Sequence, residues 1–476
     1  MASHDSSEAR FAAYGAALVD VIGHADRATP LRDYCTGLLM PAARKSVEPI
    51  AAVTAPARVA AQHQSLLHFV GQAPWSDATV LTKVRDLVLP AIERAGPIEA
   101  WIIDDTGVPK KGRHSVGVAR QYCGELGKQD NCQVAVSLSL ANERASLPVA
   151  YRLYLPRAWA DDPARRRKAG VPEAVVCQTK PQIALGQIRD ALAQGVPPGV
   201  VLTDAGYGAD MAFQAELLDL GLDYVVGILP NTSVWRRGTG PLPPKAWSGR
   251  GRPPTRPRRE AGHVPIAAED LARSLPAAAW RVVSWREGTK GPLASRFAAL
   301  RVRPGHRDYD RPKPWPELWL LIEWPEGEAE PIKYWLANLA ADTPLARLVG
   351  LAKLRWRIER DYQELKQELG LGHFEGRGWR GFHHHASLCI AAYGFLVLER
   401  ARLSPGAEAG GGFQAPALPA GFRPRGSRAA AAAARARFDR QLAPPPGRAA
   451  RAPARPVPLL RARPPHASTY HQLMTQ

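Results

Sequence analysis

The chain has 476 residues, of which 45% are apolar, and a formal net charge of +19 at pH 7. This length and apolar content suffice for two or three domains with buried cores, and the positive charge favours a polyanionic partner, most often nucleic acid. The five scattered cysteines form no C-x-x-C pair, which argues against a zinc ribbon and a disulfide framework. No apolar run approaches the roughly 20 residues of a membrane span, so a cytoplasmic protein is expected.

Residues 1–95 are predicted to form an N-terminal helical domain. Apolar residues recur at spacings of three and four from Ala12 to Ile22, and the pattern continues over 31–39 and 47–59. Asp77 is expected to cap a further helix. In a basic protein this domain could bind DNA, or it could be a packing module.

The pattern changes over residues 96–229, which we predict to be an α/β core. Short Val- and Tyr-rich runs, including AWIIDDTG, QVAVSLSLA and VAYRLYLP, are separated by turn residues and predict three or four consecutive, antiparallel strands. A helix over 179–193, the buried strand GVVLTDAGYG, a helix over 211–220 and the strand YVVGIL follow. This succession of strands and helices is typical of a mixed sheet flanked by helices.

The remainder of the chain divides into three predicted segments. Residues 230–330 contain a Pro/Arg-rich stretch and aromatic strands, which predict a β-rich insertion. Residues 331–403 return to the core with the strand KYWLANL and a helix from Thr343, its expected N-cap, to Leu369. Residues 404–476 hold eleven Arg and two acids in a low-complexity sequence, which predicts a disordered basic tail.

Acidic residues follow two of the predicted strands, and a third acid lies on the long helix. Asp104 or Asp105 ends the first strand, Asp204 ends the second, and Glu359 shares a helix face with Arg355, Tyr362 and Lys366. Three carboxylates can hold two divalent cations about 4 Å apart. Oxygen ligands of this kind suit Mg²⁺, which retains open positions for phosphate and water.

Several stretches in order resemble a family of transposases from bacterial insertion sequences. They are IDDTGVPKKGRHSVGVARQYCGELGKQDNCQVAVSLSLA, LTDAGYG, YWLAN and LRWRIERDYQELKQELGLGHFEGRGWRGFHHH, and together they span roughly residues 95–400. The resemblance is to the DDE superfamily, and it implies a ribonuclease H-like catalytic core with a β insertion between the second Asp and the Glu. The fold class expected is therefore α/β: a ribonuclease H-like mixed sheet flanked by helices, with a β-rich insertion and an N-terminal helical domain.

The resemblance also implies roles for individual residues. The first acid of this family precedes Thr in a D-D-T-like string, which indicates Asp105 rather than Asp104. With Asp204 and Glu359 it would form the catalytic, metal-binding triad for two Mg²⁺ ions, for which Mn²⁺ can substitute. The family's helix signature is Tyr, Arg, Glu and Lys at spacings of three, four and seven; the last three positions are matched here, whereas Ala352 occupies the Tyr position.

Basic residues near these acids are the predicted DNA contacts. They are Arg355 and Lys366 on the helix and Lys110, Lys111 and Arg113 after the first strand. The expected function is cleavage at the inverted-repeat ends of an insertion sequence and joining of the 3′-hydroxyl ends to target DNA. The expected partners are double-stranded DNA and a second copy of the chain in a synaptic complex, in the bacterial cytoplasm at the nucleoid. The alternatives are an inactive or domesticated DNA-binding protein and a stand-alone nuclease.

Overall fold

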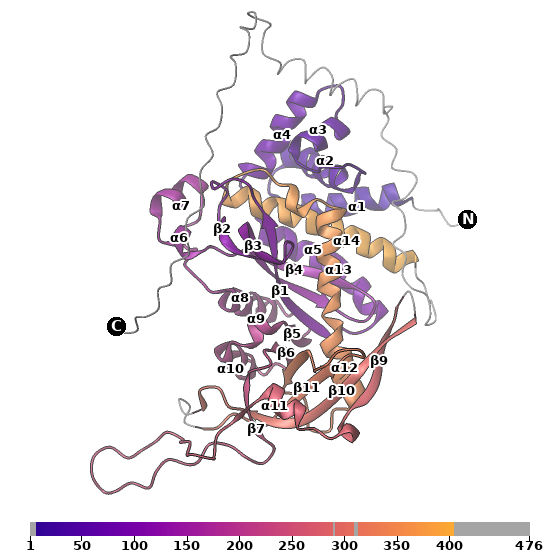
Figure 1. Ribbon diagram of the computed structural model, residues 1–476. Helices are drawn as coiled ribbons and strands as arrows, with labels where there is room; N and C mark the ends of the chain where they lie inside the picture. The colour runs from indigo at the N-terminus through magenta and orange to yellow at the C-terminus, as the bar shows by residue number, and fades with distance from the viewer. Residues whose placement is uncertain (1–5, 289–290, 309–312, 404–476) are drawn as a thin grey trace, which may run out of the picture. The chain divides into compact units, whose positions relative to one another are not determined.

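The computed structural model describes residues 6–288, 291–308 and 313–403 (Figure 1). The predicted basic tail at 404–476 lies outside these residues. Of the helices within the described ranges, none combines the length and the apolar character that a membrane crossing requires.

The first part of the chain is helical, as predicted. The helices are α1 Ser7–Val19, α2 Ala28–Leu39, α3 Val47–Thr54, α4 Val59–Gly71 and α5 Asp77–Ala95, with a short 3₁₀ turn at Ala25–Arg27. Ser76, not Asp77, caps α5, because its side chain accepts a hydrogen bond from the Thr79 backbone N–H at 3.2 Å. The cap that the sequence predicted is therefore displaced by one residue.

These helices share their apolar core with the last described helix, α14 Trp379–Leu403. The Tyr14 hydroxyl donates to the Ala391 carbonyl at 2.8 Å, and Arg10 Nε donates to Glu399 at 2.7 Å. His385 on α14 contacts the hydroxyl of Tyr34 on α2 at 2.9 Å. The N-terminal helices are therefore packed directly on the α/β part of the chain.

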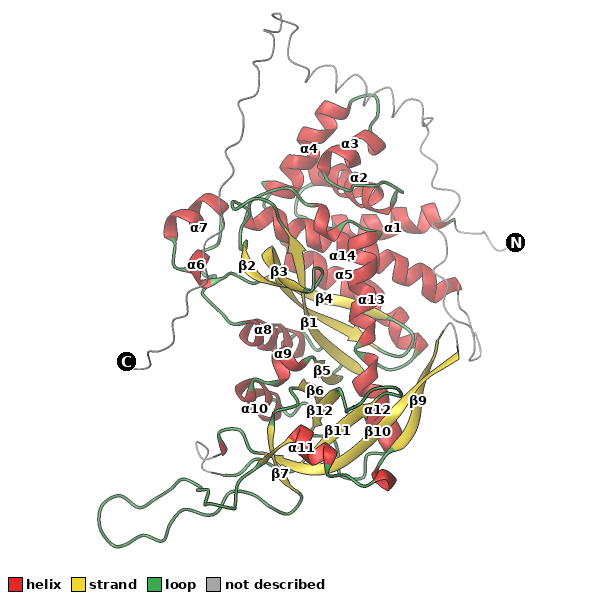
Figure 2. Ribbon diagram, in the orientation of Figure 1, coloured by secondary structure: helices red, strands yellow, loops and turns green. Residues whose placement is uncertain are grey.

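A mixed sheet forms the centre of the fold, as predicted (Figure 2). Its strand order is β4-β3-β1-β5-β6, with β2 paired to the far end of β3; β1 is antiparallel to β3 and parallel to β5, and β5 is parallel to β6. This is the strand arrangement of a ribonuclease H-like core. The strands are β1 Ala100–Pro109, β2 Ala119–Cys123, β3 Lys128–Ala141, β4 Ser146–Leu153, β5 Val200–Thr203 and β6 Tyr224–Ile228.

Side chains alternate across the sheet and separate two apolar clusters. Ala100 and Ile102 face the cluster that includes residues of α5, α13 and α14, whereas Trp101 and Ile103 face the cluster that includes residues of α8 and α10. The helices that follow β4 and β5 are α6 Arg157–Ala160, α7 Pro163–Ala169, α8 Lys180–Ala193, α9 Ala205–Gly208 and α10 Met211–Asp219.

The predicted β-rich insertion continues the same sheet. Strand β12 pairs antiparallel with β6, and β11, β10 and β7 follow in order. Within the described residues, twelve strands are therefore hydrogen-bonded in one sheet. The elements are β7 Ser233–Arg236, β8 Ile266–Ala267, α11 Ala268–Arg273, a 3₁₀ turn Ala277–Ala279, β9 Arg281–Gly288, β10 Gly291–Pro304, β11 Leu318–Trp324 and β12 Lys333–Ala337.

One helix was predicted from Thr343 to Leu369, but the structure has two helices in this segment. Helix α12 spans Leu345–Leu354 and α13 spans Trp356–Gln367, and Arg355 terminates one and begins the other. The N-cap of α12 is Pro344 rather than Thr343, and it makes no side-chain cap bond. A 3₁₀ turn at Leu371–His373 leads to α14. The break falls at Arg355, the residue whose side chain reaches Asp104 and Glu359.

Candidate active site

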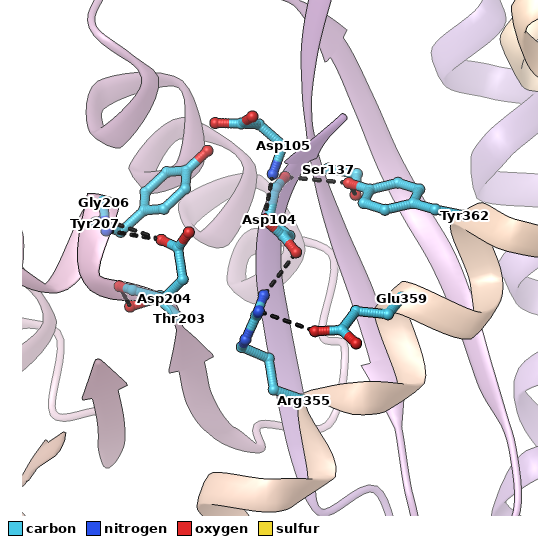
Figure 3. A network of polar contacts seen from close by, with 10 residues as sticks. All are labelled: Asp104, Asp105, Ser137, Thr203, Asp204, Gly206, Tyr207, Arg355, Glu359 and Tyr362. Carbon is cyan, nitrogen blue, oxygen red and sulfur yellow. Dashed lines mark hydrogen bonds and ion pairs between the residues drawn. The ribbon is translucent and has the colours of Figure 1, made fainter. Parts of the chain in front are cut away.

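Strand β1 presents its two neighbouring acids to opposite faces of the sheet (Figure 3). The Asp104 carboxylate lies on the α13 face, where it accepts a hydrogen bond from the Arg355 guanidinium at 2.6 Å. Asp105 lies on the α8 face and forms an ion pair with Lys180, the first residue of α8, at 2.8 Å. The structure therefore brings Asp104, and not Asp105, next to the helix that carries Glu359.

Arg355 connects the first and third acids. Its Nη1 atom donates to Asp104 and its Nη2 atom to Glu359 at 3.1 Å. The Arg355 side chain is 24% exposed and that of Asp104 15%, whereas Glu359 is 64% exposed. Asp104 is thus fixed within the fold, while Glu359 has room to change its rotamer.

The second acid, Asp204, is held by a tight turn at the end of β5. One carboxylate oxygen, Oδ1, accepts from the backbone N–H groups of Gly206 and Tyr207 at 2.9 and 3.3 Å, which caps the short helix α9. The turn lies directly on β6, because a Cβ atom on Gly208 would be 1.8 Å from the Gly227 carbonyl oxygen. The sequence TDAGYG therefore combines a capping acid with a glycine that permits close backbone contact.

The carboxylates of Asp104, Asp105 and Asp204 influence one another electrostatically. Burial raises the pKa of Asp104 to about 6; Arg355 lowers it, whereas the charges of Asp204 and Asp105 raise it. Burial also raises the pKa of the Tyr207 hydroxyl well above its ordinary value, and the same three carboxylates add to that shift. A cation placed among these carboxylates would relieve their mutual repulsion.

Tyr362, on the same helix as Glu359, contacts the backbone of β1 at the first acid. Its hydroxyl is buried, shares a hydrogen bond with Ser137 at 2.7 Å and donates to the Asp104 carbonyl at 3.2 Å. Ala352, at the position where the family pattern has Tyr, is also buried, with 7% of its surface exposed. Tyr362 therefore fixes the backbone of the first acid and is not a surface group.

The predicted DNA-contacting cations have different surroundings. Lys366 Nζ donates to the Gly107 carbonyl and to Glu125, each at 2.8 Å, and Lys110 Nζ donates to the Phe374 carbonyl at 2.7 Å. Burial lowers the pKa of Lys110. Lys111 and Arg113 are exposed in the turn after β1.

Comparison with known proteins shows the family of this chain. A family model described as a DDE superfamily endonuclease matches residues 17–292, which is more than half of the chain. The chain belongs to the DDE superfamily of endonucleases. The matched segment includes Asp104, Asp105 and Asp204 and ends before Glu359.

The DDE chain is also similar to a curated protein. It is 35% identical over 172 residues to the probable transposase for insertion sequence element IS701 from Microchaete diplosiphon. The aligned segment covers 36% of this chain and 42% of that protein. The similarity therefore extends over less than half of either chain.

DDE endonucleases generally use divalent metals, and the chemistry of the acids in this site fits such a group. Asp104, Asp204 and Glu359 offer the carboxylate oxygens that Mg²⁺ prefers. Within the part of the chain that the structure describes, no three His, Cys, Asp or Glu side chains are gathered closely enough to hold an ion. The Arg355 guanidinium instead provides positive charge between two of the acids, at a place suited to a cation.

Two partners of the acids were not predicted from the sequence. Lys180 on α8 forms an ion pair with Asp105. Ser137, the β3 residue paired with Asp104 in the sheet, shares a hydrogen bond with the Tyr362 hydroxyl. Lys180 lies 75 residues from its partner in the sequence. The sequence predicted the helix over 179–193, but not the strand that its first lysine reaches.

Proposed function

We propose that this DDE endonuclease is a DNA transposase that binds the terminal inverted repeats of an insertion sequence, cleaves at the ends and joins the 3′-hydroxyls to target DNA. One observation carries the proposal. Acids from β1, from the turn after β5 and from α13 lie at one edge of a ribonuclease H-like sheet, in the chain order Asp, Asp, Glu. The similarity to the probable transposase supports the choice of reaction.

In this proposal Asp104, Asp204 and Glu359 hold two divalent ions, Mg²⁺ or Mn²⁺ in its place. The family pattern indicates Asp105 as the first acid, but its carboxylate is paired with Lys180 on the other face of β1. When bound, such ions lower the pKa of the attacking water or 3′-hydroxyl and stabilise the leaving oxygen. Asp204 has one oxygen, Oδ2, that accepts no hydrogen bond from the described residues and is available as a ligand.

The basic residues would position the DNA. Arg355 releases the acids and turns to the scissile phosphate, for which its planar guanidinium is well suited. Lys366, Lys110, Lys111 and Arg113 contact the backbone of the same duplex. Two copies of the chain bring the two ends together in a synaptic complex, and the N-terminal helices contribute to end binding.

The decisive experiment is cleavage of labelled duplexes by the full chain in Mg²⁺. Duplexes that carry the element's own end sequence should be cut and scrambled duplexes should not. Asp204→Ala and Glu359→Gln should abolish cleavage while end binding persists. Cleavage at the wild-type rate by either variant would disprove the assignment. Cutting without regard to end sequence would instead identify a nuclease, and end binding without cleavage by the wild type would identify a DNA-binding protein.

A further inference from the structure

A long loop between β7 and β8 projects from the insertion, at the lower left of Figure 2. Its base is closed by a backbone pair, in which Leu242 and Arg258 exchange two hydrogen bonds of 2.9 Å. Between these residues the sequence is PPKAWSGRGRPPTRP, and every residue from Lys245 to Arg256 is exposed. The loop is therefore a surface structure that does not contribute to the apolar core.

The loop is strongly basic. Residues 242–258 contain five Lys or Arg and no acid. At the base, Arg258 pairs with Glu260, and Arg259 pairs with the buried Asp308 at 2.7 Å. Arg250 and Arg252, near the tip, have no side-chain hydrogen bond or ion pair among the described residues. The cations at the base stabilise the fold, whereas those at the tip point into solvent.

The tip of the loop contains two glycines that packing within the protein does not require. Gly249 and Gly251 have φ angles of +80° and +72°, and a Cβ atom on either would meet nothing within 4 Å. Pro253 and Pro254 then favour an extended chain, also for the residue before them. The Trp247 indole donates to the Gly251 carbonyl at 3.1 Å and closes the turn. The result is a thin, preformed segment with two long guanidinium side chains.

We propose that residues 249–253 insert into the minor groove of duplex DNA and prefer A·T-rich sequence. The minor groove is only about 6 Å wide, so it excludes helices and accepts a chain without bulky side chains. It narrows further in A-tracts, where its negative potential attracts inserted Arg. Arg is also more weakly hydrated than Lys and loses less on entering a groove. The glycines supply the thin backbone and Arg250 and Arg252 supply the charge.

The loop would contact DNA at a distance from the acids. Six strand spacings separate β7 from β1 in the sheet, which corresponds to roughly 30 Å. One turn of duplex measures about 34 Å, so a single DNA molecule is long enough to span this separation. This inference rests on the proposed action on DNA and adds to it a second, sequence-dependent contact.

Binding of the full chain to two duplexes of equal length, one with an A-tract and one G·C-rich, tests the inference by fluorescence anisotropy at fixed salt. The wild type should prefer the A-tract duplex by about tenfold, a typical discrimination for one or two base contacts. The double variants Arg250→Ala/Arg252→Ala and Arg250→Lys/Arg252→Lys should both lose this preference. A minor-groove ligand such as netropsin should compete with the wild type.

The control removes equal charge elsewhere, with Arg167→Ala/Lys168→Ala on exposed positions of α7. It should weaken binding to both duplexes alike and keep the preference. An equal affinity of the wild type for the two duplexes, or a preference retained by the Lys variant, would overturn the inference. If end cleavage is observed without A-tract preference, only the loop assignment fails; if the preference is observed without any cleavage, the transposase proposal fails and the loop assignment stands.

Discussion

Arg355 Nη1 lies 2.6 Å from the carboxylate of Asp104, at the residue where α12 ends and α13 begins. The same guanidinium reaches Glu359. Two of the three acids of the site are therefore neutralised by a residue of their own chain. The proposal that these acids bind metal requires this arginine to leave, which makes it the first residue to test.

Replacing Arg355 should make the protein depend on metal for its stability. In Arg355→Gln, Asp104 keeps its buried charge but loses its partner, which should cost on the order of 1–3 kcal/mol in EDTA. Because the competing cation is gone, Mn²⁺ should raise the melting temperature of the variant more than that of the wild type. Scanning calorimetry with and without Mn²⁺ measures both effects, and Arg355→Lys should be intermediate. Equal metal-induced shifts in wild type and Arg355→Gln would count against a shared site.

The two neighbouring acids of β1 should behave differently when they are neutralised. Asp104→Asn should abolish the metal-induced rise in melting temperature and reduce strand cleavage by at least about a hundredfold, because it removes a ligand. Asp105→Asn should mainly release Lys180 and retain the metal response. Calorimetry and the end-cleavage assay test this pair in parallel, and each variant is the control for the other. The opposite result would restore Asp105 as the ligand.

The sequence placed Asp204 correctly at the end of its strand, whereas Asp104 and Asp105, predicted to end theirs, lie within β1, which continues to Pro109. The sequence also could not resolve the orientation of these two acids. Asp204 was recognisable because a buried strand ends in an acid followed by glycines, and the local turn alone determines its position. Neighbours on a strand face opposite sides, so the choice between Asp104 and Asp105 depends on which helices cover each face. That information lies in contacts such as Tyr362 to Ser137, which are remote in the sequence.

The break at Arg355 and the extent of the sheet also depend on contacts remote in the sequence and could not be predicted from it. Apolar spacing runs without interruption from Leu345 to Leu365, so local pattern predicts one helix. The continuous sheet depends on the pairing of β12 with β6, and strand composition does not specify a neighbour. The aromatic strands β9, β10 and β11 of the insertion were predicted, but β7, β8 and the union of the insertion with the core sheet were not.

The turn that holds Asp204 should be sensitive to a single methyl group. In Gly208→Ala the added Cβ would collide with the Gly227 carbonyl oxygen, which is backbone and cannot rotate away. We expect a loss of about 1–3 kcal/mol in unfolding free energy and a marked fall in end cleavage, because Asp204 moves with the turn. Urea denaturation and the cleavage assay measure the two effects.

Gly186→Ala is the matched control, because Gly186 lies in α8 with nothing within 4 Å of its Cβ position. That change should leave cleavage unaltered and stabilise the protein by up to about 1 kcal/mol. A Gly208→Ala protein as stable and active as the wild type would show that the close contact is not required.

Acid should weaken the packing of the N-terminal helices on α14 through His385. Burial lowers the pKa of His385 to about 4, and the neutral ring can accept from the Tyr34 hydroxyl while donating to the Gly370 carbonyl at 3.0 Å. The unfolded chain binds a proton at an ordinary histidine pKa near 6.5, so the folded state holds fewer protons between pH 6.5 and 4. This contribution to stability is complete above pH 6.5 and should decline by on the order of 2–3 kcal/mol as the pH falls to 4. The free energy of unfolding should therefore change less between pH 7 and pH 4 in His385→Gln than in the wild type. His114→Gln, at an exposed position, is the control and should show the same change as the wild type. An equal change in all three proteins would show that His385 is not the cause.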